Sequence, residues 1–366
     1  MDIFDILLAR AGNSGGGGGG GGGGVEPKDV NFIDYDGTIL HAYTKQEFAA
    51  LTAMPDNPSH DGLVADGWNW TLTDAKAQNP VWIGQLYHTA SGATEIDVEL
   101  TSKLLNPYVN LGVDGKVTID WGDGSTNDTA QGTNLTIRVS TGHTYSAAGT
   151  YTIKVSLTSG SGYSILGTNS TPYKAVVSGD PSISSNNAMY GYMAAVKSVR
   201  MAANAGLATA ALSKCVNLEN VALCKNAKAG SYTYESCVKL RSIIFSGDET
   251  GSEYSNNRLY GCSYAKAVST PVTWQAIGSA LFQNCNDLVS LFVPPNVATI
   301  ASNAFTNCFS LRKLRFSPAS PPTVANSNAF TGLPTSCIIS VPSGSLSAYT
   351  GASNYPDDTI YTYVEE

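Results

Sequence analysis

The sequence has few charged residues and no long apolar run. Charged residues make up 14% of the chain, with 21 Lys and Arg against 29 Asp and Glu and a formal net charge of −8. The charges are spread along the sequence without a basic stripe, which argues against nucleic acid as a partner. No apolar stretch is long enough to span a bilayer, so we expect no transmembrane helix. Met1–Asp5 carries acids where a secretory signal needs positive charge, so no signal peptide is predicted.

The chain also lacks cysteine before residue 215, and the first of its seven cysteines is Cys215. No Cys-x-x-Cys pair and no nearby Cys–His pair occurs, so we expect no zinc site. The odd number of cysteines and the absence of a predicted secretion signal argue against a disulfide framework. We therefore expect buried, reduced thiols that pack as small hydrophobic groups. We expect no metal and no cofactor in the chain.

A repeat dominates the C-terminal half. Six times between Asn186 and Val341, a Cys or Met is followed by mainly apolar residues three, six and eight positions later, and a large side chain lies three positions before it. The six leading residues are Met193, Cys215, Cys237, Cys262, Cys285 and Cys308. They are spaced 22, 22, 25, 23 and 23 residues apart. Repeats of this length and rhythm stack one coil per repeat, so the pattern predicts a solenoid.

The spacing also predicts which side chains lie inside the solenoid. Positions +6 and +8, counted from the leading residue, share one face of a short strand, and positions +3 and −3 fill the coil from the other side. The predicted interior residues of the two most regular units are Leu288, Leu291, Val293, Leu311, Leu314 and Phe316. A truncated seventh unit begins at Ala329-Phe330.

The two most regular units carry a family resemblance. The segments Ala280–Leu288, Pro294–Ile300 and Ala304–Cys308 combine an Ala/Phe/Cys/Leu half with a Pro-x-x-Val-x-x-Ile half. In this they resemble the BspA-like leucine-rich repeats. The first three units lack the second half. The resemblance implies a scaffold for binding, usually adhesion, that carries no chemistry of its own.

One motif near the N-terminus points to catalysis. An apolar strand leads into Asp34-Tyr35-Asp36-Gly37-Thr38, which resembles the haloacid dehalogenase phosphatases. In that family the position of Asp34 is the nucleophile and that of Asp36 the acid/base, with Mg²⁺ between them. The family needs a doubly wound parallel sheet, and too few residues follow for one. We therefore expect a β-hairpin with Asp36-Gly37 as its turn, and the phosphatase is a remote alternative.

The rest of residues 25–92 predicts a small α+β module. Thr44-Lys45-Gln46-Glu47 is a capping-box signature that opens a short helix through Ala53. Val81–Tyr87 reads as a strand that closes the module. Three tryptophans fall within fifteen residues, which could indicate a carbohydrate platform, but in so small a module we expect them in the core. They are Trp68, Trp70 and Trp82.

From about residue 93 the pattern changes to short alternating strands, the last of them expected at Tyr173–Val177. The segments Asp120–Ser125, His143–Tyr145 and Gly149–Val155 resemble the PKD family of immunoglobulin-like sandwiches. The resemblance implies a rigid spacer over residues 93–178, with Trp121 and Tyr151 in its core.

The same segment contains three acids that could hold Ca²⁺, namely Asp120, Asp123 and Asp128. Aspartates next to glycine are also the usual residues of tight turns, because their side chains bond to the backbone two residues on. We favour the turn.

Residues 1–24 predict an anchor. Asp2–Ala11 has an apolar stripe at helical spacing, and a helix of this length is marginal alone in water. The stripe consists of Ile3, Phe4, Leu7 and Leu8. The ten glycines Gly15–Gly24 form either a flexible leash, which we favour, or a bundle packed with other copies. This order resembles the start of fibre-type proteins of phages and prophages, whose N-terminus docks on the particle. Such fibres are commonly trimeric, so we expect a homotrimer.

The sequence as a whole predicts a mainly β, multidomain chain. We expect an anchor with polyglycine linker at 1–24, a small α+β module at 25–92, a PKD-like β-sandwich at 93–180, BspA-like leucine-rich repeats at 181–342, and a C-terminal cap at 343–366. Solenoids need such a cap to cover the last coil.

This organisation favours a non-enzymatic virion structural protein, a head or tail fibre or appendage. Its expected partners are a capsid or tail protein at the N-terminus, and a host-surface glycan or protein at the repeats. A bacterial surface adhesin of BspA type is the alternative. The irregular units have an excess of Tyr and Asn, which points to binding. The predicted receptor-binding residues are Tyr232, Tyr254, Asn256, Arg258 and Tyr264.

Overall fold

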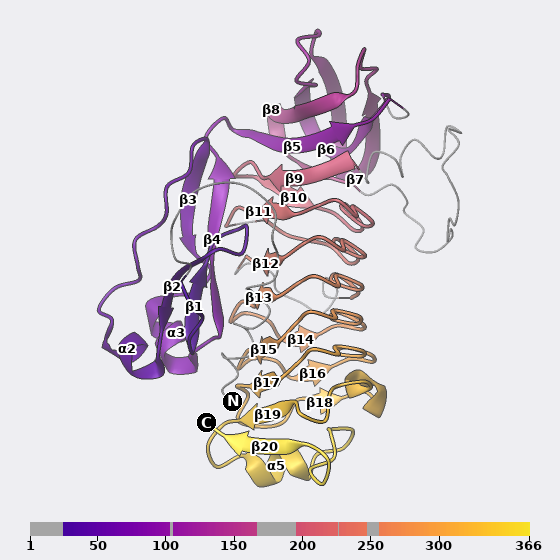
Figure 1. The fold of residues 1–366 in the computed structure, drawn as a ribbon. Coiled ribbons are helices and arrows are strands. Elements are labelled where there is room, and N and C mark those ends of the chain that lie inside the picture. The colour runs from indigo at the N-terminus through magenta and orange to yellow at the C-terminus, as the bar shows by residue number, and fades with distance from the viewer. Residues whose placement is uncertain (1–24, 103–104, 167–194, 226, 247–255) are drawn as a thin grey trace.

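The computed structural model describes residues 25–102, 105–166, 195–225, 227–246 and 256–366. The protein is mainly β and multidomain, as predicted, and a β-solenoid of about seven turns forms its C-terminal part. In Figure 1 the coils stack in a column, a sheet of long strands lies at one end of it, and the module at residues 25–92 lies alongside. The predicted anchor, the strand Tyr173–Val177 and Tyr254 lie outside the described residues.

The module contains the predicted hairpin. β1 (Val30–Ile33) pairs antiparallel with β2 (Ile39–Tyr43), and Gly37 in the turn donates its N–H to the Asp34 carbonyl at 3.0 Å. The strand order is β2-β1-β4-β3, with β3 at Leu63–Trp68 and β4 at Trp82–Thr89. The pairings described in this sheet are antiparallel except for β1 with β4. The sheet is therefore not the doubly wound parallel sheet that a haloacid dehalogenase fold requires.

Two short helices cover one side of this sheet. α2 (Lys45–Ala50) begins with the predicted capping box, in which the Thr44 side chain accepts from the Glu47 N–H and the Glu47 side chain accepts from the Thr44 N–H. It ends at residue 50, before the predicted Ala53. α3 (Leu72–Gln78) is capped by Thr71. Trp70 and Trp82 are buried, as expected of core residues.

Four antiparallel strands follow, which we call the long strands; the first has the length predicted for Thr94–Thr101, and the other three are longer than predicted. They are β5 (Ala93–Leu100), β6 (Tyr108–Asp120), β7 (Asp128–Gly142) and β8 (Gly149–Ile165). Glycines allow the long strands to pass close to one another at their register shifts. A Cβ added to Gly112 would lie 1.6 Å from the Leu135 carbonyl oxygen, and one added to Gly115 would lie 2.0 Å from that of Ser159. The strands therefore continue past Gly112 and Gly115, where a side chain would collide with the neighbouring backbone.

These strands do not form a separate unit. β5 pairs with β9 (Val196–Arg200), β8 pairs with β10 (Ala205–Leu207), and β9 pairs with β11 (Asn220–Ala222) in the second coil. A single hydrophobic core includes buried residues of the long strands and of every coil. The expectation of an independent sandwich acting as a spacer therefore needs correction. The long strands are a direct continuation of the solenoid sheet.

The remaining coils build two stacks of short strands. One stack is made of two sheets, the first of β12 (Ser242–Ile244) and β13 (Ala267–Ser269), and the second of β15 (Ser290–Val293), β17 (Lys313–Phe316), β19 (Ile338–Val341) and β20 (Thr362–Glu365). The other consists of β14 (Ala276–Ile277), β16 (Thr299–Ile300) and β18 (Thr323–Val324). Every pairing described within these stacks is parallel. Neighbouring coils therefore pair strand on strand, as in a solenoid, and in the second stack the described strands come from three coils.

The predicted interior register is confirmed, because the six residues named for the regular units are at most 1% exposed. The seven cysteines are free and buried. The thiols also donate hydrogen bonds, which the sequence did not indicate. The sulfurs of Cys237, Cys262, Cys285 and Cys308 each lie 2.9–3.2 Å from a backbone carbonyl oxygen of the preceding coil. A cysteine at this position is thus both a small apolar group and a weak donor.

The predicted cap covers the last coil. A short 3-10 helix, η2 (Ser327–Phe330), brings Phe330 onto Phe305, which stacks on Phe282 in turn. Tyr355 packs on Phe330 and so ends this ladder of rings. α5 (Leu346–Thr350) contributes the buried Tyr349, whose hydroxyl donates to the Pro318 carbonyl at 2.7 Å.

The module packs on the outward face of the parallel strands and on their carboxyl ends, and β4 runs across successive coils (Figure 1). The N–H groups of Thr89 and Tyr87 donate to the carbonyls of Met201 and Leu223, both at 2.9 Å. Further along, the Ser269 hydroxyl donates to the Trp82 carbonyl at 2.9 Å. Backbone groups at the edge of the coils therefore find their partners in the module, which ties the two parts into one body.

Gly84 in β4 provides a test of this packing. A Cβ on Gly84 would meet Cγ2 of Ile244 in β12 at 2.4 Å. Gly84→Ala should therefore lower the free energy of unfolding by about 1–3 kcal/mol through overpacking, measured by denaturant unfolding. Ile244→Ala, made in the Gly84→Ala background, should recover part of that loss. Gly206→Ala is the control, since its added Cβ meets nothing nearer than 3.4 Å. Equal effects at Gly84 and Gly206 would contradict the packing.

Candidate binding surface

The face of the parallel strands is not open to a partner over the middle coils. In β12, β13 and β15, the outward residues at positions +5 and +7 are as buried as the inward ones, with exposed fractions of 6% or less. These outward residues are Ser242, Ile244, Ala267, Ser269, Ser290 and Phe292. They lie beneath the module, where Trp70 packs on Phe292 with ring centroids 5.8 Å apart. The chain's own module therefore occupies this face.

The structure separates the predicted receptor-binding residues. Tyr232 is partly exposed and Asn256 is exposed, and the two are adjacent, because the Tyr232 N–H donates to the Asn256 carbonyl at 3.1 Å. Tyr264 is 57% exposed but lies on a different side of its coil, two residues after Cys262. The predicted residues that the structure describes thus do not form one contiguous surface.

Arg258 is not at the surface, which corrects its prediction. Its exposed fraction is 1%, and its guanidinium carbon lies 5.7 Å from the centroid of the Phe245 ring. Position 258 is four residues before Cys262, next to the interior position of Leu259, so its side chain enters the solenoid instead of the solvent. The sequence suggested a binding residue because Arg258 lies in one of the irregular units that are rich in Tyr and Asn.

A compact group of exposed side chains lies on the third and fourth coils instead. Positions +2 and +4 point outward because position +3 points inward, as the fully buried Leu240 and Ala265 show. The Lys266 N–H donates to the Arg241 carbonyl at 2.9 Å, so the two coils are neighbours at this point. We call the four exposed residues at these positions the basic patch: Lys239, Arg241, Tyr264 and Lys266.

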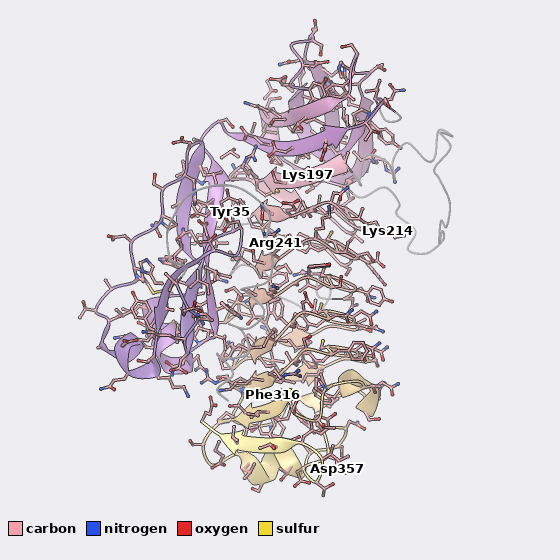
Figure 2. The ribbon with its side chains drawn as sticks, in the orientation of Figure 1. Tyr35, Lys197, Lys214, Arg241, Phe316 and Asp357 are labelled. Carbon is pink, nitrogen blue, oxygen red and sulfur yellow. The ribbon has the colours of Figure 1, made fainter. Side chains whose placement is uncertain are left out.

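The basic patch corrects the view that charge is evenly spread. Residues 181–342 contain twelve Lys and Arg and six Asp and Glu, in a chain whose net charge is −8. In Figure 2, Lys197 and Arg241 lie between the module and the turn that carries Lys214. Lys197 is paired with Glu99 and Glu219, at 3.4 Å each. The three cations of the basic patch have no ion-pair partner among the described residues.

Asp34 and Asp36, the residues of the phosphatase motif, lie in the turn of the hairpin. Asp34 is 3% exposed and accepts hydrogen bonds from Tyr87 at 2.9 Å and from the Tyr35 N–H at 2.8 Å. His60 Nε2 lies 2.6 Å from its other oxygen. Burial and the neighbouring Asp34 raise the pKa of Tyr87. Asp36 accepts the Thr38 N–H, as a turn residue does. Both carboxylates therefore have structural partners within the module.

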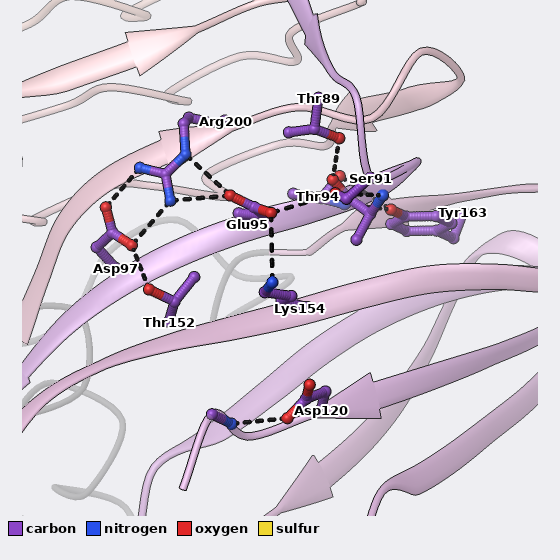
Figure 3. Close-up of polar contacts among 12 residues, drawn as sticks. Thr89, Ser91, Thr94, Glu95, Asp97, Asp120, Thr152, Lys154, Tyr163 and Arg200 are labelled. Atoms are coloured by element: carbon purple, nitrogen blue, oxygen red, sulfur yellow. Dashed lines mark hydrogen bonds and ion pairs between the residues drawn. The ribbon is translucent and has the colours of Figure 1, made fainter. Parts of the chain in front are cut away.

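The region where the long strands meet the first coil contains an ion-pair network, which Figure 3 shows. Arg200 in β9 contacts Asp97 at 2.6 Å and Glu95 at 3.0 Å, both in β5. Burial raises the pKa of Asp97, but hydrogen bonds from Arg200, Ser198 and Thr152 outweigh it and lower the pKa overall. Every charge in this network is paired across strands, so we assign it to holding β5 on β9 instead of to binding.

The three acids considered for calcium have separate partners. Asp120 accepts the Gly122 N–H at 2.9 Å and Asp128 accepts the Trp121 indole N–H at 2.8 Å. Hydrogen bonds from Ser125 and His143 lower the pKa of Asp123 to about 2. Within the described residues, no group of three or more His, Cys, Asp and Glu side chains is placed to hold a metal ion. No described helix has the length and hydropathy to cross a membrane.

Comparisons with known proteins match the coils. Residues 205–337 match the family model described as the BspA type leucine-rich repeat region, in six copies. Among curated proteins, none matches the chain.

Two solved structures are similar to parts of the chain. A leucine-rich repeat protein from Bacteroides ovatus ATCC 8483 is 20% identical, with a TM-score of 0.32, over 46% of this chain and 54% of its own. A leucine-rich repeat protein from T. pallidum is 21% identical, with a TM-score of 0.29, over 42% of this chain and 72% of its own. The match thus spans about half the length of the Bacteroides protein.

Proposed function

Starting from coils that are BspA-type leucine-rich repeats, we propose that this is a non-enzymatic surface-binding protein. The observation that carries the proposal is a rigid solenoid with one continuous core and an exposed side beyond the module. The long strands cover one end, the cap covers the other, and the module occupies the parallel-strand face. The exposed outward positions of the coils, including the basic patch, remain for a partner.

We further propose that the protein belongs to a phage or prophage particle, as a head or tail fibre or appendage. Ile3, Phe4, Leu7 and Leu8 would dock it on a capsid or tail protein, and the coils would bind a host-surface glycan or protein. The proposal rests on the order of apolar segment, polyglycine run and repeat scaffold along the sequence. A bacterial surface adhesin of BspA type is the alternative, and the repeats support it equally.

Deleting residues 1–24 tests the anchor. The described part should stay folded, because its buried residues pack on one another in two extensive hydrophobic clusters, and incorporation into particles should be lost. Circular dichroism checks the fold, and mass spectrometry of purified virions against cell envelopes checks incorporation. Light scattering should show a homotrimer for the full chain and a smaller species for the truncated one. Normal entry of the truncated protein into virions would refute the anchor, and a protein found only in envelopes would favour the adhesin.

A further inference from the structure

We propose that the basic patch binds one acidic sugar unit of a surface polysaccharide, an inference that rests on the proposed surface-binding function and specifies its ligand. The patch consists of Lys239 and Arg241 on the third coil and Tyr264 and Lys266 on the fourth. Three cations and one aromatic ring therefore occupy a two-by-two arrangement on adjacent coils.

The dimensions of the patch suit a single anionic group. Arg241 and Lys266 immediately precede β12 and β13, and the 2.9 Å hydrogen bond between their backbones places them side by side on adjacent coils. Lys239 and Tyr264 lie two residues before them in the turns of the same coils. The three cationic side chains can thus converge on one carboxylate, sulfate or phosphate. Hydrogen bonds between ionised partners are about twice as strong as neutral ones. Because these cations have no ion-pair partner among the described residues, binding an anion breaks no salt bridge there.

Acids border the patch and keep it small. Glu219, which contacts Lys197 at 3.4 Å, holds position +4 on the second coil, and Asp287 holds position +2 on the fifth. On the module side, the turn that carries the exposed Asp36 packs on Ser242, the residue after Arg241. Duplex nucleic acid binds through many phosphates at regular spacing, and these acids would oppose the phosphates beyond the first. The borders therefore favour an isolated charge over a polyanionic backbone.

Tyr264 supplies the second element of recognition. Its side chain is 57% exposed, between Lys239 and Lys266, although a ring of this size usually buries most of its surface. The face of an aromatic ring is negative, so it attracts the C–H groups on the face of a sugar ring. Tyr264 would stack on the sugar ring while the neighbouring cations bind its acidic group. The ligand that suits both is an acidic monosaccharide unit.

The test uses the full-length protein and three polymers: polygalacturonate, dextran sulfate and neutral dextran. We expect binding to at least one of the two acidic polymers and none to dextran. The triple variant Lys239→Gln/Arg241→Gln/Lys266→Gln should weaken binding tenfold or more. The control triple Lys116→Gln/Lys225→Gln/Lys228→Gln removes three exposed cations elsewhere and should change binding less than twofold. Tyr264→Ala should weaken binding at least threefold, whereas Phe309→Ala, with the same 57% exposure, should not.

Each other outcome overturns the site. Equal losses in the two triple variants would mean that overall charge, not this patch, attracts the polymer. Tighter binding of duplex DNA than of either acidic polymer, at equal salt, would assign the patch to nucleic acid. If the protein binds neither acidic polymer, the proposal that the patch binds an acidic sugar is wrong. If the patch variant still binds whole host cells as the parent does, the site is wrong and the surface-binding function stands. If the parent binds no cells, the proposed function itself fails.

Discussion

Replacing Trp70 with alanine should lower the free energy of unfolding by about 3–5 kcal/mol, the range for buried Trp→Ala changes. Trp70 is 4% exposed, and it joins the module to the solenoid. Its ring packs on Phe292 of β15, and its indole N–H donates to the Thr270 carbonyl at 3.0 Å. The substitution leaves a cavity between two parts of the molecule and a buried carbonyl without its donor. Denaturant unfolding of the full chain measures the loss.

A double-mutant cycle tests whether the loss comes from the contact between the module and the solenoid or from a cavity within the module alone. Trp70→Ala and Phe292→Ala should be less damaging together than the sum of the single changes, because each removes the same ring contact. Trp70→Phe is the conservative control, since it keeps most of the apolar contact and loses the hydrogen bond. Additive effects of Trp70→Ala and Phe292→Ala, or a loss below about 1 kcal/mol for Trp70→Ala, would mean that the module does not dock as described.

Leu291→Ala should lower the free energy of unfolding by about 2–5 kcal/mol. Leu291 is 1% exposed and lies at position +6, where it faces Leu314 of the next coil in parallel register. The coils above and below hold the backbone, so the cavity cannot collapse easily, and the cost should lie well above that of an exposed site. The full chain is the correct material, because the coils share their core with the long strands.

Leu346→Ala is the matched control for this prediction. Leu346 is 37% exposed, in α5 of the cap, and surface changes of this kind usually alter stability by no more than about 0.5 kcal/mol. Similar losses at Leu291 and Leu346 would show that position +6 does not point inward. The interior register assigned from the repeat would then be wrong.

The features read correctly from the sequence are local or periodic. The hairpin at Asp36-Gly37 follows from the conformational freedom of one glycine and from side chains that bond their own turn. The capping box at Thr44 and Glu47 satisfies backbone groups within a single helical turn. The solenoid register follows from six copies of one spacing. A single exception, such as the polar Thr270 at position +8 of the fourth unit, does not change the register that the other units define.

Other features depended on contacts between distant segments, and these the sequence did not reveal. Arg258 is buried and Tyr264 is exposed, although both belong to the same irregular unit. β6, β7 and β8 extend beyond their predicted bounds, and glycines such as Gly112 let the neighbouring backbones come close, which only the tertiary structure shows. The basic patch combines residues 25 positions apart in the sequence, such as Arg241 and Lys266. They are neighbours because stacking places position +4 of one coil beside position +4 of the next.

By itself, then, the sequence determined the solenoid, its inward residues, the free thiols and the hairpin, because each of these needs only repetition or neighbours in the chain. The tertiary structure alone decided that residues 25–92 cover the parallel-strand face. A signal for it was present in the small or apolar residues at +5 and +7 of the middle coils, such as Ala267, Ser269 and Phe292. Apolar residues on the outward face of a strand indicate that this face is buried, but they do not identify the segment that buries it. That choice is made by the shape and hydrogen bonds of a module nearly two hundred residues away, and it leaves the outward positions, including the basic patch, exposed for binding.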